Sequence, residues 1–260
     1  MSFDAPCFIL NLKRSPDRRE RISRSFKRLG IPFEFIDAID GATLSDTDIR
    51  NAVTSGYSRS LGFKIPPGYI ACSLSHRLAL QTIIEREIDV GIVFEDDTDL
   101  SDDFAERVGT ALAVPCKWDV LKLCSVLHDR AKGKILARAQ FGKIVRLPIP
   151  SYLANAYAIS NIGAQKLLPA IFPVRELLDI CFQTPWRTGI DVCELLPYPA
   201  HPADMPSTVE RSSLLERKGV IRTLRRLPGR IDRSIGRRLH MIRWFGWKAA
   251  IGIEDLDVVN

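Results

Sequence analysis

The first forty residues alternate between two hydrophobic periods. The apolar run 7–12 predicts a buried strand, and residues 18–29 carry apolar side chains at helical spacing. Gly30 ends that helix, and residues 33–37 alternate as a second strand. A strand, a helix and a strand in this order predict a β-α-β unit with parallel strands.

The pattern continues through the middle of the chain. Residues 40–65 are polar and irregular, which predicts an excursion over the surface. Residues 73–87 have helical periodicity, and the apolar runs 90–94 and 120–123 predict two short buried strands. Residues 156–168 predict a strand, a turn and a helix. The whole pattern predicts an α/β fold around a mostly parallel mixed sheet.

The C-terminal segment differs from the rest of the chain in charge. Residues 217–248 hold 11 of the 37 lysines and arginines but one of the 31 acidic residues, which leaves 26 bases against 30 acids elsewhere. The net charge of +6 is therefore a property of this segment. We predict one α/β domain (residues 1–209) and a basic amphipathic helical tail (residues 210–260), broken at Pro228-Gly229.

Composition and cysteine spacing narrow the class of protein. A hydrophobic content of 46% and a charged content of 26% predict a packed core rather than general disorder. The six cysteines are widely spaced and form no CxxC pair, so we expect buried thiols in a reducing compartment, not a zinc site or disulfides. Because the sequence has neither a visible signal peptide nor an apolar run of about 20 residues, we expect a cytoplasmic protein.

The sharpest local motif is the acidic triplet Glu95-Asp96-Asp97, directly after the apolar run 90–94. In open α/β sheets, ligands bind beyond the carboxyl ends of the strands. Carboxylates at such a position can hold a hard divalent cation, which in turn binds the phosphates of a nucleotide. The alternative is a solvated acidic turn before the next helix, because more aspartates follow in 99–103.

Three pairs of segments resemble glycosyltransferase family 25, the lipooligosaccharide galactosyltransferase-like group. They are FILNLKRSPDRRERI with FEFIDAIDG, GYIACSLSHRLALQ with VGIVFEDDTDL, and SYLANAYAISNIGAQKLL with LLDIC. Their order and spacing resemble the family from Cys7 to Asp204. The resemblance implies a GT-A type, Rossmann-like catalytic domain, a nucleotide-sugar donor (often UDP-galactose), a divalent Mn²⁺ or Mg²⁺, and transfer with inversion.

Mapped onto this chain, the resemblance implies both donor-binding and metal-binding residues. Those expected against the nucleotide sugar are Asn11, Arg14, Arg18, Asp37, Asp40, His76, Glu95, Asn155 and Tyr157. Those expected at the metal are Asp96, Asp97 and, from a later strand, His201.

Several of these assignments have a structural alternative. Arg14 and Arg18 either pair with phosphate and stack on the base, or form an exposed arginine cluster. Asp40 precedes a glycine, and turn chemistry alone explains that pair. A helical histidine such as His76 is often a packing residue, and Tyr157 is equally well explained as a core residue.

Inversion at a sugar carbon requires a general base that takes the proton of the acceptor hydroxyl. Asp179 holds the position of the family's own aspartate, and its apolar neighbours would raise its pKa toward a useful range. Asp191 is the second candidate, and either residue could instead cap a helix. Residues 175–178 depart from the family pattern, which often has a proline before this aspartate.

The basic tail places apolar residues at helical spacing among its arginines. These are Ile235, Leu239, Ile242 and Phe245, with Trp244 and Trp247 alongside. Such a helix is typical of an interfacial anchor on an anionic membrane, which suits a lipid-linked acceptor on the inner face of the cytoplasmic membrane. The alternatives are a helix packed on the catalytic domain and a nucleic-acid surface. No nucleic-acid-binding module accompanies the tail, so we expect no nucleic-acid partner.

These observations favour one function over its rivals. We expect an inverting, metal-dependent glycosyltransferase of lipopolysaccharide biosynthesis that moves a hexose, first of all galactose from UDP-galactose, onto a surface glycan. A catalytically silent nucleotide- or glycan-binding scaffold is the first alternative. A nucleotide-sugar hydrolase or a nucleotidyltransferase that uses the same acidic triplet is the other.

Overall fold

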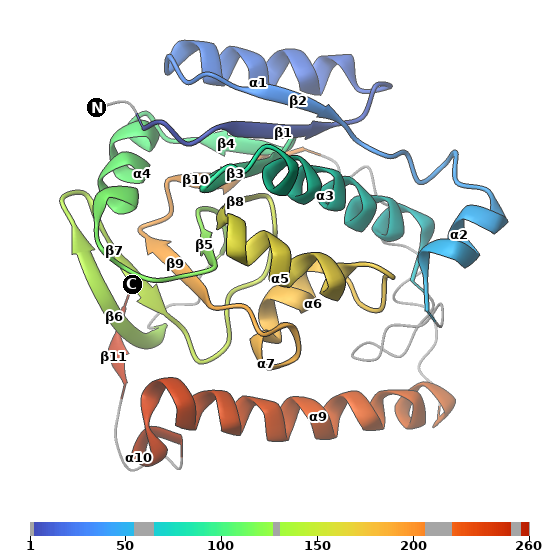
Figure 1. Ribbon diagram of the computed structural model, residues 1–260, viewed down its shortest axis with the longest axis vertical. Coiled ribbons are helices and arrows are strands. Elements are labelled where there is room, and N and C mark those ends of the chain that lie inside the picture. The colour runs from blue at the N-terminus through green and yellow to red at the C-terminus, as the bar shows by residue number, and fades with distance from the viewer. Residues whose placement is uncertain (1–2, 55–64, 127–130, 206–219, 251–255, 260) are drawn as a thin grey trace.

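A nine-stranded mixed sheet forms the centre of the protein (Figure 1). This computed structural model describes residues 3–54, 65–126, 131–205, 220–250 and 256–259. The strands in spatial order are β11 (Asp257–Val258), β6 (Lys132–Ala139), β7 (Gly142–Arg146), β9 (Val192–Leu196), β5 (Val120–Lys122), β8 (Ala156–Ser160), β3 (Val90–Glu95), β1 (Cys7–Asn11) and β2 (Glu34–Asp37). A separate antiparallel pair joins β4 (Thr98–Leu100) to β10 (Ala200–Pro202).

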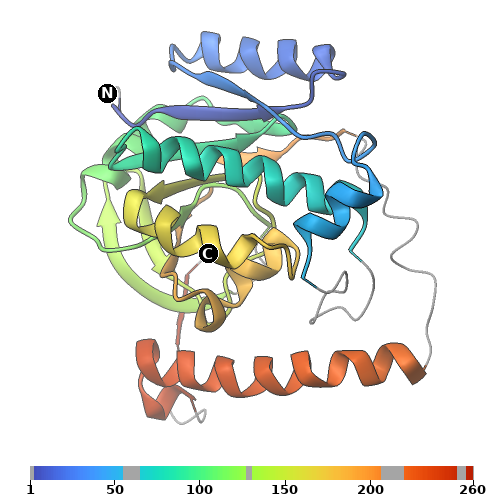
Figure 2. The same cartoon turned by 45° about the vertical axis from the view of Figure 1, so that its right-hand side comes forward.

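Helices cover both faces of the sheet (Figure 2). The helices of the described chain are α1 (Pro16–Arg28), α2 (Asp46–Ala52), α3 (Pro67–Glu85), α4 (Phe104–Ala113), α5 (Asn161–Ile171), α6 (Leu178–Gln183), α7 (Pro185–Thr188), α9 (Val220–Phe245) and α10 (Trp247–Ala250), of which α1 and α4 cover one face of the sheet and α3, α5 and α6 the other. Alternate strand residues face opposite layers. Ile9 packs toward α1 and α4, whereas Phe8 and Leu10 pack toward α3, α5 and α6.

Strand direction determines which loops meet. β1, β2, β3, β5 and β9 run one way, and β8 lies antiparallel between β3 and β5. The ends of β1, β3 and β5 therefore meet the start of β8 at one edge of the sheet, which we call the carboxyl edge. There the N–H of Glu95 donates to the carbonyl of Asn155 at 2.7 Å. This is the edge at which α/β sheets bind ligands.

The predicted α/β fold with a large mixed sheet is confirmed, but two predictions for the segment before β3 are wrong. The helix predicted from residue 73 begins at Pro67, because Pro66 occupies the N-cap position and Pro67 suits the first turn. Within the predicted surface excursion lies α2, which begins with a capping box between Ser45 and Asp48. The rest of that excursion includes residues 55–64, which lie outside the described part of the chain.

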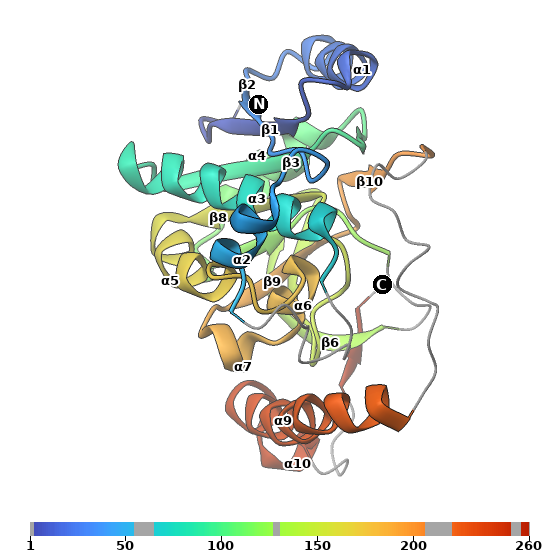
Figure 3. The same ribbon diagram turned by 90° about the vertical axis from the view of Figure 1, so that its right-hand side faces the viewer.

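Helix α9 continues through Pro228-Gly229, so the predicted break there is wrong (Figures 1 and 3). A proline inside a helix removes one backbone hydrogen bond, which is a local cost. The next turns are held against α7: Asp232 forms an ion pair with Arg187 and accepts a hydrogen bond from Trp186 at 3.3 Å. These contacts keep the residues after the proline helical.

The side of α9 that faces the domain combines a glycine with polar and aromatic residues. A side chain at Gly236 would place its Cβ 2.1 Å from the indole of Trp186, so the two elements meet at van der Waals distance only because this residue is glycine. Further along the helix, the guanidinium of Arg146 lies 3.7 Å from the ring centre of Trp244. Among the described residues, no helix is long and apolar enough to cross a membrane.

The Gly236–Trp186 contact predicts that alanine at position 236 destabilises the protein, although helix propensity alone would favour alanine there. Alanine inside a helix is favoured over glycine by about 1 kcal/mol, so Gly236→Ala would stabilise an unpacked helix. Because the added Cβ meets Trp186, we expect Gly236→Ala to lower the thermal midpoint of unfolding instead. Ser234→Ala, at an exposed position of the same helix, is the control and should leave the midpoint unchanged or higher. A rise in both variants would contradict the observed packing.

Candidate active site

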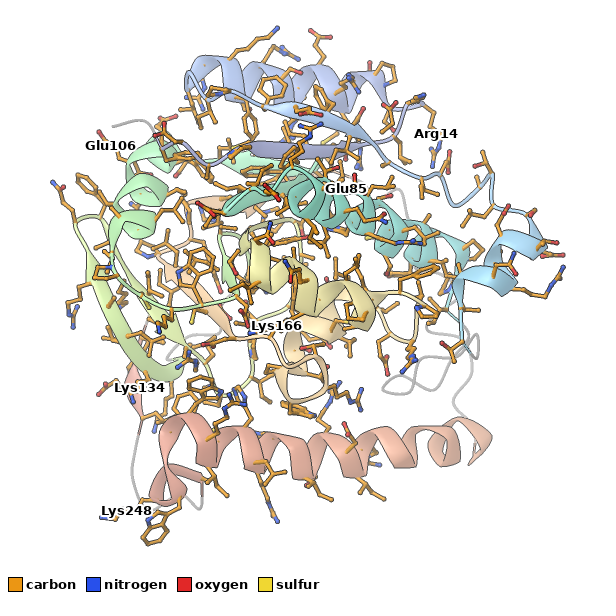
Figure 4. All side chains as sticks on the ribbon, in the orientation of Figure 1. Arg14, Glu85, Glu106, Lys134, Lys166 and Lys248 are labelled. Atoms are coloured by element: carbon orange, nitrogen blue, oxygen red, sulfur yellow. The ribbon has the colours of Figure 1, made fainter. Side chains whose placement is uncertain are left out.

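A cavity of about 420 Å³ opens at the carboxyl edge, between the ends of β1, β2 and β3 and the first turns of α3. Figure 4 labels Arg14 beside the ends of β1 and β2, at this end of the molecule. The acidic triplet lies on one side of the cavity, and the loop after β2 lies on the other. The two walls approach closely, because a Cβ at Gly41 would lie 2.7 Å from the backbone of Gly68.

Asp96, the middle residue of the triplet, is engaged by two buried partners. Its Oδ1 accepts a hydrogen bond from the Arg18 guanidinium at 2.8 Å, and its Oδ2 accepts one from the Asn11 amide at 2.7 Å. All three side chains are buried. Asn11 comes from the end of β1 and Arg18 from the first turns of α1, so this network joins both elements to the end of β3.

The negative charge of the Asp97 carboxylate is only partly compensated by the residues that contact it. Its Oδ1 accepts a hydrogen bond from the Asn155 amide at 2.6 Å. Burial, and then the neighbouring charges of Glu95 and Asp96, raise the pKa of Asp97 to about 6, against the opposing effects of Arg18 and Asn155. A divalent cation would relieve this repulsion, so the donor set fits a hard metal ion.

His76 is a buried residue that connects the helix layer to the triplet. Its Nδ1 lies 2.9 Å from the Tyr157 hydroxyl, and its Nε2 lies 3.2 Å from a carboxylate oxygen of Glu95. The two rings also stack, with centroids 5.7 Å apart. Tyr157 is fully buried, so it acts on the site through His76, whose ring it orients.

A second set of possible metal ligands, which includes sulfur and nitrogen atoms, shares Glu95 with the acidic triplet. Cys72 and His76 stand one helical turn apart on α3, and one ligand atom from each lies within 4.8 Å of the other and of a Glu95 oxygen. Nitrogen and sulfur ligands suit zinc better than manganese or magnesium. Cys72 is a site residue that the sequence analysis missed, although its i, i+4 spacing from His76 was a usable signal.

Asp179, at the start of α6, acts electrostatically on two residues around the site. Burial, and then the charges of Glu95, Asp179 and Asp97, raise the pKa of the Cys72 thiol well above its ordinary value. The charge of Asp179 also acts on Lys122, whose pKa is lowered chiefly by burial. Asp179 is therefore near both the cavity wall and the end of β5.

Three sequence candidates, Arg14, Asp37 and Asp40, line or border the cavity on the β2 side. Asp40 forms an ion pair with Arg14, and this hydrogen bond lowers the pKa of the carboxyl below its ordinary value. Both residues line the cavity. Asp37 ends β2 and is exposed, 3.1 Å from the Lys13 ammonium. Ser75, which the sequence analysis did not single out, holds this loop by accepting a hydrogen bond from the N–H of Ile39 at 2.9 Å.

The structure does not bring Asp191 to this cavity. It precedes β9 and so lies at the opposite edge of the sheet, where it is paired with Arg146 and the Nε of that arginine donates to it at 3.0 Å. His201 lies opposite Asp99 in the β4–β10 pair. Two residues later, the N–H of Ala203 donates to the carbonyl of Asp97 at 2.7 Å, so this late segment does return to the triplet.

A buried polar cluster next to the triplet was also missed by the sequence analysis. Lys122 is fully buried and donates to the Ser151 hydroxyl at 2.9 Å and to the carbonyl of Tyr152. Glu194, also fully buried, accepts from the N–H of Ser151 at 2.7 Å. The cluster fixes the segment just before Asn155. A lysine and a glutamate within short apolar strands were the only sequence signal for it.

Comparison with known proteins identifies the family of the chain. Residues 4–182 match the family described as glycosyltransferase family 25 (LPS biosynthesis protein), which is more than half of the chain. The chain therefore belongs to glycosyltransferase family 25.

The relatives are longer proteins. Procollagen galactosyltransferase 1-A of Xenopus laevis is 31% identical over 207 residues, which is 70% of this chain and 31% of that protein. A mouse relative described as inactive glycosyltransferase 25 family member 3 is 29% identical over 195 residues, 70% of this chain and 32% of that protein. The chain thus spans about a third of the length of these relatives. Among solved structures, mannose-1-phosphate geranyltransferase from Thermus thermophilus aligns over 76% of this chain and 74% of its own, at 8% identity and a TM-score of 0.35, too low to support any conclusion.

The raised pKa of Asp97 makes a prediction about stability and pH in the metal-free protein. A carboxyl whose pKa is raised from 3.8 to about 6 by folding stabilises the protein while it is protonated, and this contribution is lost as pH rises through about 6. We expect Asp97→Asn to be more stable than the wild type at pH 7, by about 3 kcal/mol, and no more stable near pH 4. Urea unfolding with a chelator across this range measures the difference.

The matched control for this measurement is Asp102→Asn. The Asp102 side chain is 86% exposed and forms its ion pair with Arg28, away from the triplet. Its free energy of unfolding should stay parallel to that of the wild type across the range. If the free energy of unfolding of Asp97→Asn also followed that of the wild type at every pH, the proposed charge repulsion within the triplet would be contradicted.

Proposed function

We propose that this chain is a GT-A type, metal-dependent, inverting glycosyltransferase that moves a hexose from a nucleotide donor onto a surface glycan. One observation carries the proposal: the acidic triplet borders a cavity of about 420 Å³ at the carboxyl edge, in a chain of family 25. Relatives named procollagen galactosyltransferases support galactose from UDP-galactose as the first donor to test. The family description supports a lipopolysaccharide or lipooligosaccharide acceptor.

The donor would occupy the cavity with its base toward β2 and its diphosphate toward the triplet. The cavity volume is within the range of about 300–1,000 Å³ that is usual for small-molecule sites. Arg14 is half-exposed at the mouth and offers a guanidinium to phosphate, while Asp40 beside it offers a carboxylate to a ribose hydroxyl. Asn11 and Arg18 hold Asp96 and thereby orient the triplet.

The proposed Mn²⁺ or Mg²⁺ would be held by Asp97 and Glu95. Both oxygens of Asp96 already accept hydrogen bonds, so this residue serves to position its neighbours. When bound, such a cation neutralises charge on the departing diphosphate. Asn155 keeps one Asp97 oxygen in place, and His76 does the same for Glu95.

Asp179 is the proposed general base. Attack with inversion requires a base on the acceptor side, away from the nucleotide. The electrostatic effects of Asp179 on Cys72, which lines the cavity, and on Lys122 support a position beside the proposed donor site, and Asp179 itself is not among the cavity-lining residues. Asp191 is paired with Arg146 at the other edge of the sheet, so it is not carried into this proposal.

A donor screen tests the reaction and the roles of two carboxylates. We expect nucleoside diphosphate to be released from one nucleotide sugar only when both manganese and a truncated lipooligosaccharide acceptor are present. Asp97→Asn should abolish release while the protein stays folded, because the metal loses a ligand. Asp179→Asn should lower kcat about 100-fold or more without weakening donor binding, because only proton transfer is lost. Asp102→Asn is the exposed control and should retain full activity.

The other outcomes of this screen identify the rival functions. Release that needs metal but no acceptor would indicate a nucleotide-sugar hydrolase. Nucleotide binding without release from any donor would indicate a silent relative, the description that the mouse relative carries. Undiminished turnover by Asp97→Asn would remove the metal assignment.

We also propose that α9 attaches the protein to the inner, anionic face of the cytoplasmic membrane, where a lipid-linked acceptor is found. Its support is an apolar stripe on the outer side of the helix. The side chains of Ile231, Ile235, Leu239, Ile242 and, just beyond, Trp247 are between 48% and 61% exposed. Figure 4 shows side chains projecting from this side of α9, away from the sheet. Arginines flank the stripe, as in interfacial helices.

The stripe predicts a specific loss of membrane binding. Ile235→Asp with Leu239→Asp should abolish cosedimentation with anionic vesicles, because two charges would enter the acyl boundary. Ile162→Asp changes an equally exposed apolar residue on α5 and is the control, which should bind as the wild type does. Equal binding by all three proteins would place the attachment elsewhere. Unchanged nucleotide binding by the double variant verifies that its catalytic domain is folded.

A further inference from the structure

A groove of about 680 Å³ lies between α9, α10 and the segment around Ile149. Four arginines line it: Arg230, Arg233, Arg237 and Arg238. The remaining lining residues are uncharged, so among the described residues no carboxylate faces this groove. Four guanidinium groups around one groove repel each other unless an anion lies between them.

One guanidinium nitrogen in this groove lacks a hydrogen-bond partner among the described residues. The Nη2 atom of Arg233 is buried and makes no hydrogen bond within the described part of the chain. Leaving a buried donor of a charged group unsatisfied is costly, and native proteins usually satisfy such donors with a protein group, a water or a ligand. The acid nearest in sequence, Asp232, is committed to Arg187 and Trp186 on the other side of the helix.

The surroundings of the groove are also strongly positive. Burial, and then the charges of Arg146 and Arg243, lower the pKa of His240 on the same helix to about 4. The histidine is therefore neutral at physiological pH, and it does not add to the cationic groups. The field that helps to keep it neutral comes from arginines, and it favours an anion near this part of α9.

The arginine groove and the apolar stripe occupy adjacent sides of one helix. Arg230 precedes Ile231, Ser234 precedes Ile235, Arg238 precedes Leu239 and Met241 precedes Ile242, so four of the groove residues on α9 stand next to a stripe residue. A soluble anion would use only the first of these sides. A phosphate that carries acyl chains would use both.

We propose that this groove is a binding site for the phosphate group of an anionic membrane lipid, with the acyl chains against the Ile231–Ile242 stripe. Arg233 donates to the phosphate from the floor of the groove, and Arg230 and Arg237 bind it from the helix surface. The site deepens the proposed membrane attachment, since it names a headgroup contact rather than general charge attraction. It is independent of the transfer reaction.

The test compares two charge-matched double variants of the full chain. Vesicles of phosphatidylcholine with phosphatidic acid should bind the wild type, and Arg233→Gln with Arg237→Gln should bind about ten-fold more weakly or worse. Arg24→Gln with Arg28→Gln removes the same charge from exposed positions on α1 and should bind close to the wild type. Equal losses in both double variants would mean general charge attraction and would overturn the site.

Two further arms distinguish the source of the phosphate. Short-chain soluble phosphatidic acid should bind the wild type more tightly than inorganic phosphate does. Equal affinity for the two would reduce the groove to a free-phosphate site and overturn the lipid assignment. Tighter binding of a single-stranded RNA than of vesicles, lost in the same groove variant, would overturn it in favour of a polyanion surface.

The outcome for this site can be separated from the outcome for the proposed enzyme. Donor turnover with a soluble acceptor does not involve Arg233 or Arg237, so the groove variant should keep the wild-type rate. If the wild type transfers no sugar but the groove variant loses vesicle binding, the lipid site stands and the transferase proposal fails. If transfer is normal and vesicle binding is unaffected by the groove variant, the lipid site is wrong.

Discussion

The buried contact of Asp96 with Arg18 and Asn11 is the constraint on which the carboxyl edge depends. Three adjacent carboxylates repel each other, and the chain compensates the middle one most closely, while the same Arg18 guanidinium lies 3.9 Å from an oxygen of Asp97. The neighbours of Asp96 then point to different partners, Glu95 to His76 and Asp97 to Asn155. Because these partners come from α1, β1, α3 and the start of β8, one acidic motif joins both helical layers to the sheet. Burial, and then the charges of Glu95 and Asp96, raise the pKa of Asp97 to about 6, so the negative charge at this edge is only partly compensated by the protein.

Much of the fold follows from local sequence, because buried parallel strands are continuous apolar runs and α1 has a clear helical period. The elements near residues 7–12, 18–29, 33–37 and 90–94 are visible for this reason. The hairpin of β6 and β7 is not, because its strands are half-exposed and carry lysine, arginine and glycine. Local sequence also overestimates the helix-breaking effect of Pro228, because contacts made further along the same helix outweigh one missing backbone hydrogen bond.

The site was predictable where residues belong to a motif and obscure where the fold assembles them. The triplet, Asn11, Arg18 and Asn155 stand in recognisable segments, and they do come together. Lys122 and Glu194 lie 72 positions apart and meet around Ser151, a pairing that no spacing rule contains. Asp191 is a residue that the sequence made a candidate base but that the fold separates from the site. Because β9 runs parallel to β5, Asp191 lies at the edge of the sheet opposite the cavity.

The contact between Gly41 and Gly68 has a consequence for how donor choice could change in this scaffold. Backbone meets backbone there, so Gly41 cannot gain a side chain without moving the loop after β2 away from α3. Variation in the shape of the cavity is therefore expected at its other lining positions, such as Ala38, Ala42 and Ala71. These are small residues, where larger side chains would reduce the cavity volume. If the proposed sugar transfer holds, a search for altered donor preference, in nature or by directed evolution, should find its accepted substitutions at these alanines and leave Gly41 intact.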